Sequence, residues 1–394
     1  MDVEDKLRAL SAAARFDICG YNGPRDFIPS PQRFIYRSTL LGGGSVCLFK
    51  VLLTNVCMND CAYCTNRVAR DVPRHAFLPE ELARTFMQLH QRRMVQGLFL
   101  SSGIADNPSH TMEAMIKTVE ILRYKYAFKG YIHLKILPGA SFDCVAEGCK
   151  LADRVSVNME APTVQHLSRL SKRKDLQRNI VEPMRWVKKL TAADQNLVPS
   201  GQTTQFVVGA AGESDQELLR TTAALYREVD LRRAYFSPFR PVPDSPLEGK
   251  PPANPLRAHR LYQSDWLLRI YGFPLPEVEL ALGEKGNLSL QKDPKLVIAE
   301  NQPWLFPVDV NRASYGELLR VPGIGPVSAR RIIDARREHS IDSMRQLRKM
   351  RVVTSRAVAY IWFRGMLEWE KQASFIPHLE VLDEPAPTLV SAIG

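Results

Sequence analysis

Six apolar, β-branched stretches alternate with helix-forming segments along the first part of this 394-residue chain. The stretches lie at 47–54, 98–102, 131–137, 154–160, 203–209 and 233–238, and the helix-forming segments at 79–95, 111–127, 180–194 and 214–229. This alternation indicates parallel strands joined by right-handed crossovers. It predicts an α/β fold, a partial (β/α)6 barrel of TIM type, in which ligands bind at the carboxyl ends of the strands.

The sequence outside this alternating region indicates additional segments and a second domain. Seven prolines between Pro238 and Pro255 mark an extended connector, a helix is expected near 255–271, and 273–305 has no regular pattern. The expected parts are an N-terminal extension (1–44), a core (45–242), a connector and post-core segment (243–305), a small all-α domain (306–372) and a flexible tail (373–394).

The composition predicts a soluble, cytoplasmic protein. A hydrophobic content of 45% permits a real core, and the acidic start Met1–Lys6 is unlike a secretory signal. No charge-free apolar run reaches the roughly 18 residues that a membrane helix requires. Of seven cysteines, three are clustered and four are scattered, unlike a disulfide framework.

The net charge of +11 is concentrated in two segments. Residues 165–189 hold eight Lys or Arg and two acids, and residues 306–371 hold thirteen and seven, so each segment carries +6. This localisation favours a track for a polyanion. The alternative, equally open from charge alone, is that each segment is the solvated face of a helix.

Cys57, Cys61 and Cys64 follow the first predicted strand with the spacing C-x3-C-x2-C. A closed zinc site and an ordinary electron-transfer cubane each take four protein ligands, so three thiolates leave one metal position for a small molecule. Two alternatives are a zinc site completed by His75 and a cluster with a purely structural role.

This triad, with the aromatic Tyr63 before its last cysteine, resembles the radical S-adenosylmethionine (SAM) superfamily over roughly residues 45–240. The resemblance implies a 4Fe-4S cluster held by the three cysteines, with its open iron chelated by the amino and carboxylate groups of SAM. Reductive cleavage of SAM then yields a 5′-deoxyadenosyl radical that abstracts hydrogen from a substrate. A reductant such as flavodoxin or ferredoxin is implied as a partner.

Other strand ends resemble the cofactor-binding motifs of that superfamily. The turn Ser101–Gly103 takes the place of its Gly-Gly-Glu turn, but Ile104 replaces the glutamate. Asn158 and Glu160 are two apart on one expected strand and therefore face one side. The implied cofactor-binding residues are Tyr63, Ser101, Ser102, Gly103, Lys135, Asn158, Glu160, Gly212 and Glu213.

Lys135 belongs to this set because it is expected to be a buried lysine inside the barrel. His133 and Lys135 share one face of an expected strand and are predicted to point into the barrel. A buried lysine without a carboxylate partner is costly, so a cofactor carboxylate or a substrate phosphate is an expected partner for Lys135.

The segment Pro322-Gly-Ile-Gly325, followed by a basic helix ending near Arg337, resembles a helix-hairpin-helix module over roughly 306–364. Glycines there leave backbone N–H groups bare beside a helix N-terminus, an arrangement that binds phosphate without reading bases. The second hairpin has Met350–Val353 where glycines are usual, so it is expected mainly to pack against the first. Residues expected to bind nucleic acid are Val321, Gly323, Ile324, Gly325, Arg330 and Arg331.

The loop Lys172, Arg173 and Lys174 follows the fourth predicted strand and is expected on the same rim as the cysteines, where it would extend the phosphate track. A duplex base would have to be flipped to reach a radical in the barrel. Taken whole, the chain resembles the DNA modification and repair radical SAM proteins, which implies a uracil-DNA-glycosylase-like partner. The predicted function is radical modification or repair of nucleic acid, with DNA favoured over RNA. The alternatives are a radical enzyme for a small molecule or protein, with the hairpin as a docking module, and a non-catalytic iron-sulfur protein that binds nucleic acid.

Overall fold

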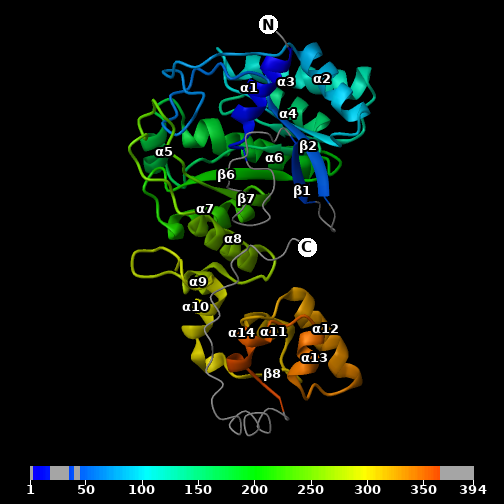
Figure 1. The fold of residues 1–394 in the computed structure, drawn as a ribbon, viewed down its shortest axis with the longest axis vertical. Coiled ribbons are helices and arrows are strands. Elements are labelled where there is room, and N and C mark those ends of the chain that lie inside the picture. Colours follow the sequence, from blue (N-terminus) through cyan, green and yellow to red (C-terminus); the bar gives the residue numbers. More distant parts are fainter. Residues whose placement is uncertain (1–2, 18–34, 40–44, 364–394) are drawn as a thin grey trace. The chain divides into compact units, whose positions relative to one another are not determined.

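The structure, a computed structural model, describes residues 3–17, 35–39 and 45–363 (Figure 1). The chain divides into two compact units, Met1–Pro294 and Lys295–Gly394. The expected tail, 373–394, and most of the expected N-terminal extension lie outside the described residues. No helix of the described residues has the length and hydrophobicity that crossing a bilayer requires.

A seven-stranded sheet forms the centre of the first unit, and its strands follow one another in chain order. β1 runs antiparallel to β2, and every later pair is parallel. The sheet curls into a half-barrel, which confirms the predicted α/β fold class. β1 was not predicted from the sequence. The strands are β1 (Ile35–Thr39), β2 (Ser45–Leu52), β3 (Gly97–Ser101), β4 (Tyr131–Lys135), β5 (Arg154–Ser156), β6 (Gln202–Val208) and β7 (Leu231–Pro238).

Helices connect the strands of the sheet. Side-chain caps begin several of them: Asn107, Ser141 and Ser214 accept hydrogen bonds from the first-turn N–H groups of α3, α4 and α7. The short helices α4 and α5 were not predicted, because two or three turns give little periodic signal. The helices are α1 (Val3–Ala14), α2 (Pro79–Gln91), α3 (Pro108–Glu120), α4 (Phe142–Leu151), α5 (Val164–Leu170), α6 (Glu182–Ala193), α7 (Asp215–Glu228) and α8 (Pro255–Arg269), with π-helical turns at Ile121–Lys125 and Leu176–Val181.

The two faces of the sheet differ in polarity. On one face, Phe49 stacks on Phe86 of α2, and Leu134 lies under Gly148 of α4. The opposite face is the interior of the half-barrel. Strand pairing places Lys50, Phe99, His133 and Arg154 in one row across that interior, and Lys135 beside Ser156 in the next. The interior is therefore partly polar and basic.

Residues 273–305 are not irregular throughout, contrary to expectation. They contain α9 (Leu275–Glu279), α10 (Pro294–Glu300) and a 3-10 turn, Pro303–Leu305. Prolines stand in the first turns of α9 and of the 3-10 turn, where a missing N–H is tolerated.

The second unit consists of two short helical hairpins and a two-residue parallel ladder. Leu318, Leu319, Ile332 and Leu347 are buried between its helices. Asn311 ties the unit together, because its side chain donates to the Ile341 carbonyl and accepts from the Ile341 N–H, at 2.9 and 2.8 Å. After α10 and the 3-10 turn at its start, its elements are β8 (Val308–Asp309), α11 (Tyr315–Arg320), α12 (Pro326–Glu338), α13 (Met344–Lys349), α14 (Thr354–Ala357), a 3-10 turn (Val358–Tyr360) and β9 (Ile361–Trp362).

Candidate functional site

The three clustered cysteines lie on the loop that follows β2, and this loop is paired with the turn after β3. The Gly103 N–H donates to the Thr54 carbonyl at 2.7 Å, and the Met58 N–H donates to the Ile104 carbonyl at 2.6 Å. The two segments approach so closely that a Cβ on Gly103 would lie 2.3 Å from the Val56 carbonyl oxygen. Glycine is therefore required there, and the Ser101–Gly103 turn lies directly beside the cysteine loop.

Arg74 fixes the path of the cysteine loop. One of its terminal nitrogens donates to the carbonyls of Asn55 and Asn66, at 2.6 and 2.9 Å. The other donates to the carbonyls of Arg67 and Arg70, at 2.8 and 2.9 Å. One guanidinium thus joins backbone before the triad to backbone after it, so hydrogen bonds of the polypeptide itself help to fix the shape of the loop.

Asp60 holds a second segment against the cysteine loop. Its carboxylate accepts from the Ser171 hydroxyl at 2.5 Å and from the Lys172 N–H at 3.1 Å. Burial acts to raise the pKa of Asp60, but these hydrogen bonds outweigh burial and lower it. Arg173 adds a contact to the Met58 carbonyl. The expectation that residues 172–174 lie beside the cysteines is confirmed.

The role of Lys174 differs from the expectation. Its side chain is only 7% exposed and pairs with the equally buried Glu160 at 3.3 Å. Burial acts to lower the pKa of Lys174, but Cys61, Glu160 and Cys64 raise it, so the ammonium stays charged. An inward-facing, paired lysine does not offer its charge to an external phosphate. Of the three basic residues, Lys172 and Arg173 are exposed.

The sulfur atoms are in a setting that suits a metal cluster more than free thiolates. Burial raises the pKa of the Cys61 thiol, and burial together with Cys61 raises that of Cys64 to about 12. Metal coordination deprotonates such thiols, and Lys174 then supplies a positive charge beside the thiolates. The Asn66 N–H also donates to the Cys64 sulfur at 3.4 Å.

The residues present fit a cubane with an open corner. In the described part of the chain, no three His, Cys, Asp or Glu side chains converge closely enough for a single metal ion, so the zinc alternative with His75 gains no support. A cubane requires no such convergence, because each thiolate binds a different iron. Beside the loop, the Ser102 hydroxyl is buried without a hydrogen-bond partner among the described residues, which suits a polar group of a bound cofactor.

Tyr63 and Glu160 meet beside the triad. The Tyr63 hydroxyl lies in hydrogen-bonding contact with the Glu160 carboxylate, and burial, followed by the charge of Glu160, raises the pKa of Tyr63. The assumption that Asn158 and Glu160 lie on one strand, and so face one side, is wrong: β5 ends at Ser156, and Glu160 has a φ of 65°. This backbone conformation is strained for a glutamate and is held by bonds to β6, where the Glu160 N–H donates to the Gln205 carbonyl at 2.9 Å. Asn158 is buried.

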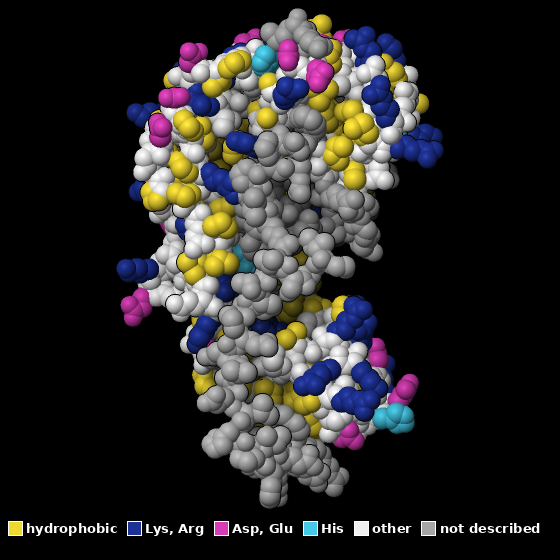
Figure 2. All heavy atoms as spheres, viewed as in Figure 1, with side chains coloured by type: hydrophobic (Ala, Val, Ile, Leu, Met, Phe, Trp, Pro, Cys, Tyr) yellow, Lys and Arg dark blue, Asp and Glu magenta, His cyan; other side chains and the backbone are white. Residues whose placement is uncertain are grey.

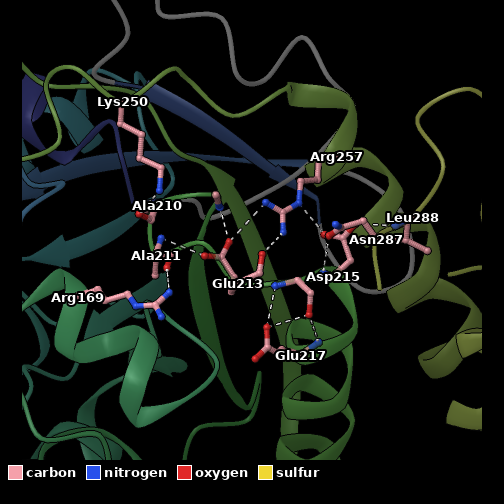
Figure 3. Close-up of polar contacts among 12 residues, drawn as sticks. Arg169, Ala210, Ala211, Glu213, Asp215, Glu217, Lys250, Arg257, Asn287 and Leu288 are labelled. Carbon is pink, nitrogen blue, oxygen red and sulfur yellow. Dashed lines mark hydrogen bonds and ion pairs between the residues drawn. The ribbon is translucent and has the colours of Figure 1, made fainter. Parts of the chain in front are cut away.

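The turn after β6 uses its glutamate internally (Figure 3). The Glu213 carboxylate accepts from the N–H groups of Gly209 and Ala211 and lies 3.7 Å from Arg257. Gly212 takes a φ of 81° to close the turn. The Glu213 side chain is directed into its own turn, so the expected contact of this turn with the cofactor stays a prediction for its backbone alone.

Neighbouring groups complete the bracing of this turn. Lys250 donates to the Ala210 carbonyl and Arg169 to the Ala211 carbonyl, at 2.8 and 2.9 Å. Asp215 pairs with Arg257 at 2.7 Å and accepts from the Leu288 N–H at 2.9 Å (Figure 3). The segment once expected to be irregular therefore helps to anchor the start of α7.

Lys135 has a carboxylate partner within the chain, which was not expected. Its ammonium pairs with Asp17, just beyond the end of α1. The premise that it lacks such a partner is wrong, and the argument for a cofactor carboxylate or a substrate phosphate there does not hold. His133 is buried and hydrogen-bonds to the Ser156 hydroxyl at 2.9 Å.

The glycine turn of the second unit lies between α11 and α12. The Val321 and Ile324 side chains are buried, and their N–H groups donate to the carbonyls of Leu318 and Val321, so both are core residues, contrary to the expectation of contact. Gly323 has a φ of 87°, and a Cβ there would lie 2.4 Å from the Val353 carbonyl oxygen. The N–H groups of Gly323 and Gly325 donate no hydrogen bond to any described residue.

The second hairpin packs on the first, as expected. The Val353 N–H donates to the Gly323 carbonyl at 3.0 Å, and Ser328 donates to the Arg351 carbonyl at 2.8 Å. Arg351 takes a φ of 64°, a conformation in which glycine is common. Figure 2 shows basic side chains gathered over α12 and α13. Exposed basic residues of these hairpins include Arg330, Arg331, Arg345, Arg348, Lys349 and Arg351.

Three residues of this site were missed by the sequence analysis: Asp17, Asp60 and Arg74. Their partners are either backbone groups or side chains that lie far away in the sequence. Asp17, for example, pairs with Lys135. Neither spacing nor periodicity carries a signal for such contacts.

Comparisons with known proteins agree with this geometry. Residues 51–225 match the model of the Radical SAM superfamily, and residues 307–361 match that of the helix-hairpin-helix motif. A search of curated proteins found no significant match.

Several solved structures resemble the chain at low identity. The [FeFe]-hydrogenase maturase HydG matches with 12% identity and a TM-score of 0.44, over 56% of this chain and 49% of that one. HydG from Carboxydothermus hydrogenoformans gives the same identity and TM-score, over 56% and 50%. Methylornithine synthase (PylB) matches with 14% identity and a TM-score of 0.45, over 68% and 70%. The matched region spans about half the length of the HydG chains.

The two family matches coincide with the two sites described above. The cysteine loop and the braced strand ends fall within 51–225, and the glycine turn falls within 307–361. The chain therefore contains a radical SAM domain, an enzyme domain whose cofactors are a 4Fe-4S cluster and SAM, followed by a helix-hairpin-helix motif.

Proposed function

We propose that this protein is a radical SAM enzyme that modifies or repairs a nucleic acid, with DNA preferred over RNA. The observation that carries the proposal is the presence, in one chain, of a radical SAM domain and a helix-hairpin-helix motif with bare turn N–H groups and exposed arginines. That combination supports a substrate with a phosphate backbone. We further propose a cytoplasmic protein with a flavodoxin- or ferredoxin-like reductant and a uracil-DNA-glycosylase-like partner.

In this proposal the residues of the first unit hold and orient the cofactors. Cys57, Cys61 and Cys64 ligate the cluster, and Lys174 compensates the negative charge of their thiolates. Ser102 offers its unpaired hydroxyl to the amino end of SAM. The bound cofactors supply reductive cleavage of SAM to a 5′-deoxyadenosyl radical, while the protein excludes water from the reacting centre.

The residues of the second unit bind the backbone of the substrate. The N–H groups of Gly323 and Gly325 and the charges of Arg330 and Arg331 suit phosphate oxygens and carry no sequence information. The target base then has to leave its stack, or be single-stranded, to reach the radical domain.

The test is anaerobic turnover with deuterated oligonucleotides and the reconstituted, reduced enzyme. We expect deuterium in the 5′-deoxyadenosine that is released, measured by mass spectrometry. SAM cleavage without deuterium from DNA or RNA of either strandedness would contradict the proposal and favour a small-molecule or protein substrate. An intact cluster without SAM cleavage would favour the non-catalytic alternative.

Gly325→Ala is the cleaner test of the hairpin. At φ −102° Gly325 adopts a conformation open to alanine, whereas Gly323 has the positive φ and the close contact to Val353. The added methyl group obstructs the approach of a phosphate, so we expect DNA affinity to fall about tenfold with folding intact. Fluorescence anisotropy and circular dichroism measure the two effects.

Charge at the hairpin is tested separately by salt dependence. Arg330→Gln is expected to reduce the slope of log affinity against log salt by about one. Arg337→Gln is the matched control, since it lies near the other end of α12 and already contacts Asp334 at 3.6 Å. If log affinity falls with log salt at the same slope for Arg330→Gln and for the unmodified protein, α12 is not part of the nucleic-acid interface.

A further inference from the structure

The chain just after the cysteine triad turns back onto the triad. The Val68 N–H donates to the Asn59 carbonyl at 2.9 Å, on the backbone between the first two cysteines. The Arg70 guanidinium donates to the Thr65 carbonyl at 2.8 Å. The Val68 side chain is 45% exposed, and Arg67 and Arg70 are half-buried on either side of it in the sequence. This segment therefore presents two arginines and an apolar side chain at the surface of the cysteine loop.

A second basic segment, which follows α5, borders the same stretch of backbone. The Arg173 side chain contacts the Met58 carbonyl, and the Lys172 N–H donates to the Asp60 carboxylate at 3.1 Å. Both contacts are made to direct neighbours of Asn59 in the sequence. The side chains of Lys172 and Arg173 are exposed. Residues 67–70 and 172–173 thus form one basic surface over the backbone that carries the candidate cluster ligands.

The four cations of the basic surface form no ion pair with a described residue. The side chains of Arg67 and Lys172 make no hydrogen bond to the described part of the chain, and the other two contact only carbonyl oxygens. Two exposed acids at the ends of the segments, Asp71 and Asp175, offset half of the four charges. The surface therefore stays positive and suits a negatively charged partner.

The mixed character of the basic surface favours a protein partner over a nucleic acid. Val68 and Ala69 are exposed and apolar, and they lie among the cations. An apolar centre with a charged rim is typical of protein interfaces, whereas a phosphate backbone makes no use of an apolar centre. The N–H groups of Val68 and Lys172 are also used within the protein, unlike the bare N–H groups of the hairpin turn.

We infer that the basic surface is the docking site for the protein that reduces the cluster, and that the contact face of this donor is negatively charged. The need for a donor protein rests on the proposed function. Electron transfer slows steeply with distance, and a protein bound here lies directly against the cysteine loop. After docking, the donor is oxidised by one electron, which the cluster accepts, and no bond forms or breaks. Small charged interfaces are usual for such brief redox encounters.

Arg67→Glu tests the docking site in the reconstituted, full-length enzyme without substrate. Flavodoxin hydroquinone, an acidic one-electron donor, is mixed anaerobically with the protein in stopped flow, and its oxidation to the semiquinone is followed by absorbance. We expect the bimolecular rate at low salt to fall about tenfold, and the difference from the unmodified protein to shrink as salt rises. SAM cleavage driven by dithionite should be unchanged, because this small reductant needs no docking surface.

A second variant and a control accompany Arg67→Glu. Val68→Asp places a negative charge on an exposed side chain and keeps the backbone bond to Asn59, so the same slowing is expected. Lys129→Glu is the matched control. Lys129 is exposed and precedes β4, at the amino ends of the strands, whereas the cysteine loop follows the carboxyl end of β2. This variant should oxidise flavodoxin at the rate of the unmodified protein.

Three outcomes would overturn the inference. The first is an equal flavodoxin rate in Arg67→Glu, Val68→Asp and the unmodified protein. The second is a matching loss of dithionite-driven cleavage, which would make Arg67 a support of the cluster. The third is weaker DNA binding by fluorescence anisotropy with an unchanged flavodoxin rate, which would assign the surface to nucleic acid. Failure of the proposed function is distinguishable, because deuterium transfer from oligonucleotides is then missing while the effect of Arg67→Glu on flavodoxin oxidation persists.

Discussion

Cys61→Ala is expected to eliminate the iron-sulfur chromophore and all reductive cleavage of SAM. Cys61 is the most buried of the three clustered cysteines and lies in contact with Lys174, so no solvent ligand replaces its thiolate easily. With two protein ligands left, the cubane loses one of its three anchored irons. Visible absorbance, iron and sulfide content, and 5′-deoxyadenosine release measure the effect.

Cys149→Ala is the matched control. Its thiol is also buried, which raises its pKa to about 12, but it lies on α4, away from the triad. This variant should keep its full iron content and SAM cleavage. An intact cluster in Cys61→Ala, or an equal loss in Cys149→Ala, would overturn the ligand assignment.

Lys174→Met is expected to lower the free energy of unfolding by about 3–5 kcal/mol, because it leaves Glu160 as a buried charge without its partner. The cluster should also be incorporated less completely, since the positive charge beside the thiolates is gone. Urea unfolding and iron analysis after reconstitution measure the two effects.

The control for Lys174→Met is Lys172→Met, two residues earlier and exposed, for which a change within about 0.5 kcal/mol is expected. Adding Glu160→Gln to Lys174→Met should recover part of the lost stability, because the unpaired charge is removed. If Lys174→Met behaves like Lys172→Met, the buried pair does not stabilise the fold.

The fold was predictable because strands and helices alternate over most of the first unit, and each parallel strand lies beside its neighbour in sequence. What could not be predicted is which charged side chains turn inward. In Lys172–Lys174, three adjacent cations look alike in sequence, yet only Lys174 is buried against Glu160. The Asp17–Lys135 pair joins residues 118 positions apart.

In the second unit, too, the local backbone motif was predictable and the burial of side chains was not. The two glycines of its turn identify the motif, since their backbone requirements are local. The apolar residues between and before them, Val321 and Ile324, were predicted as contacts but are core residues. Periodicity could not separate the two roles over so short a turn.

The four carbonyl bonds of Arg74 and the contacts of Asp60 have a consequence for how the metal centre is assembled. Zinc fingers fold only when the metal arrives, so chelators denature them. Here the polypeptide holds the cysteine loop in shape by its own hydrogen bonds. We therefore expect the loop to keep its fold when the cluster is removed, unlike the metal-binding loops of a zinc finger.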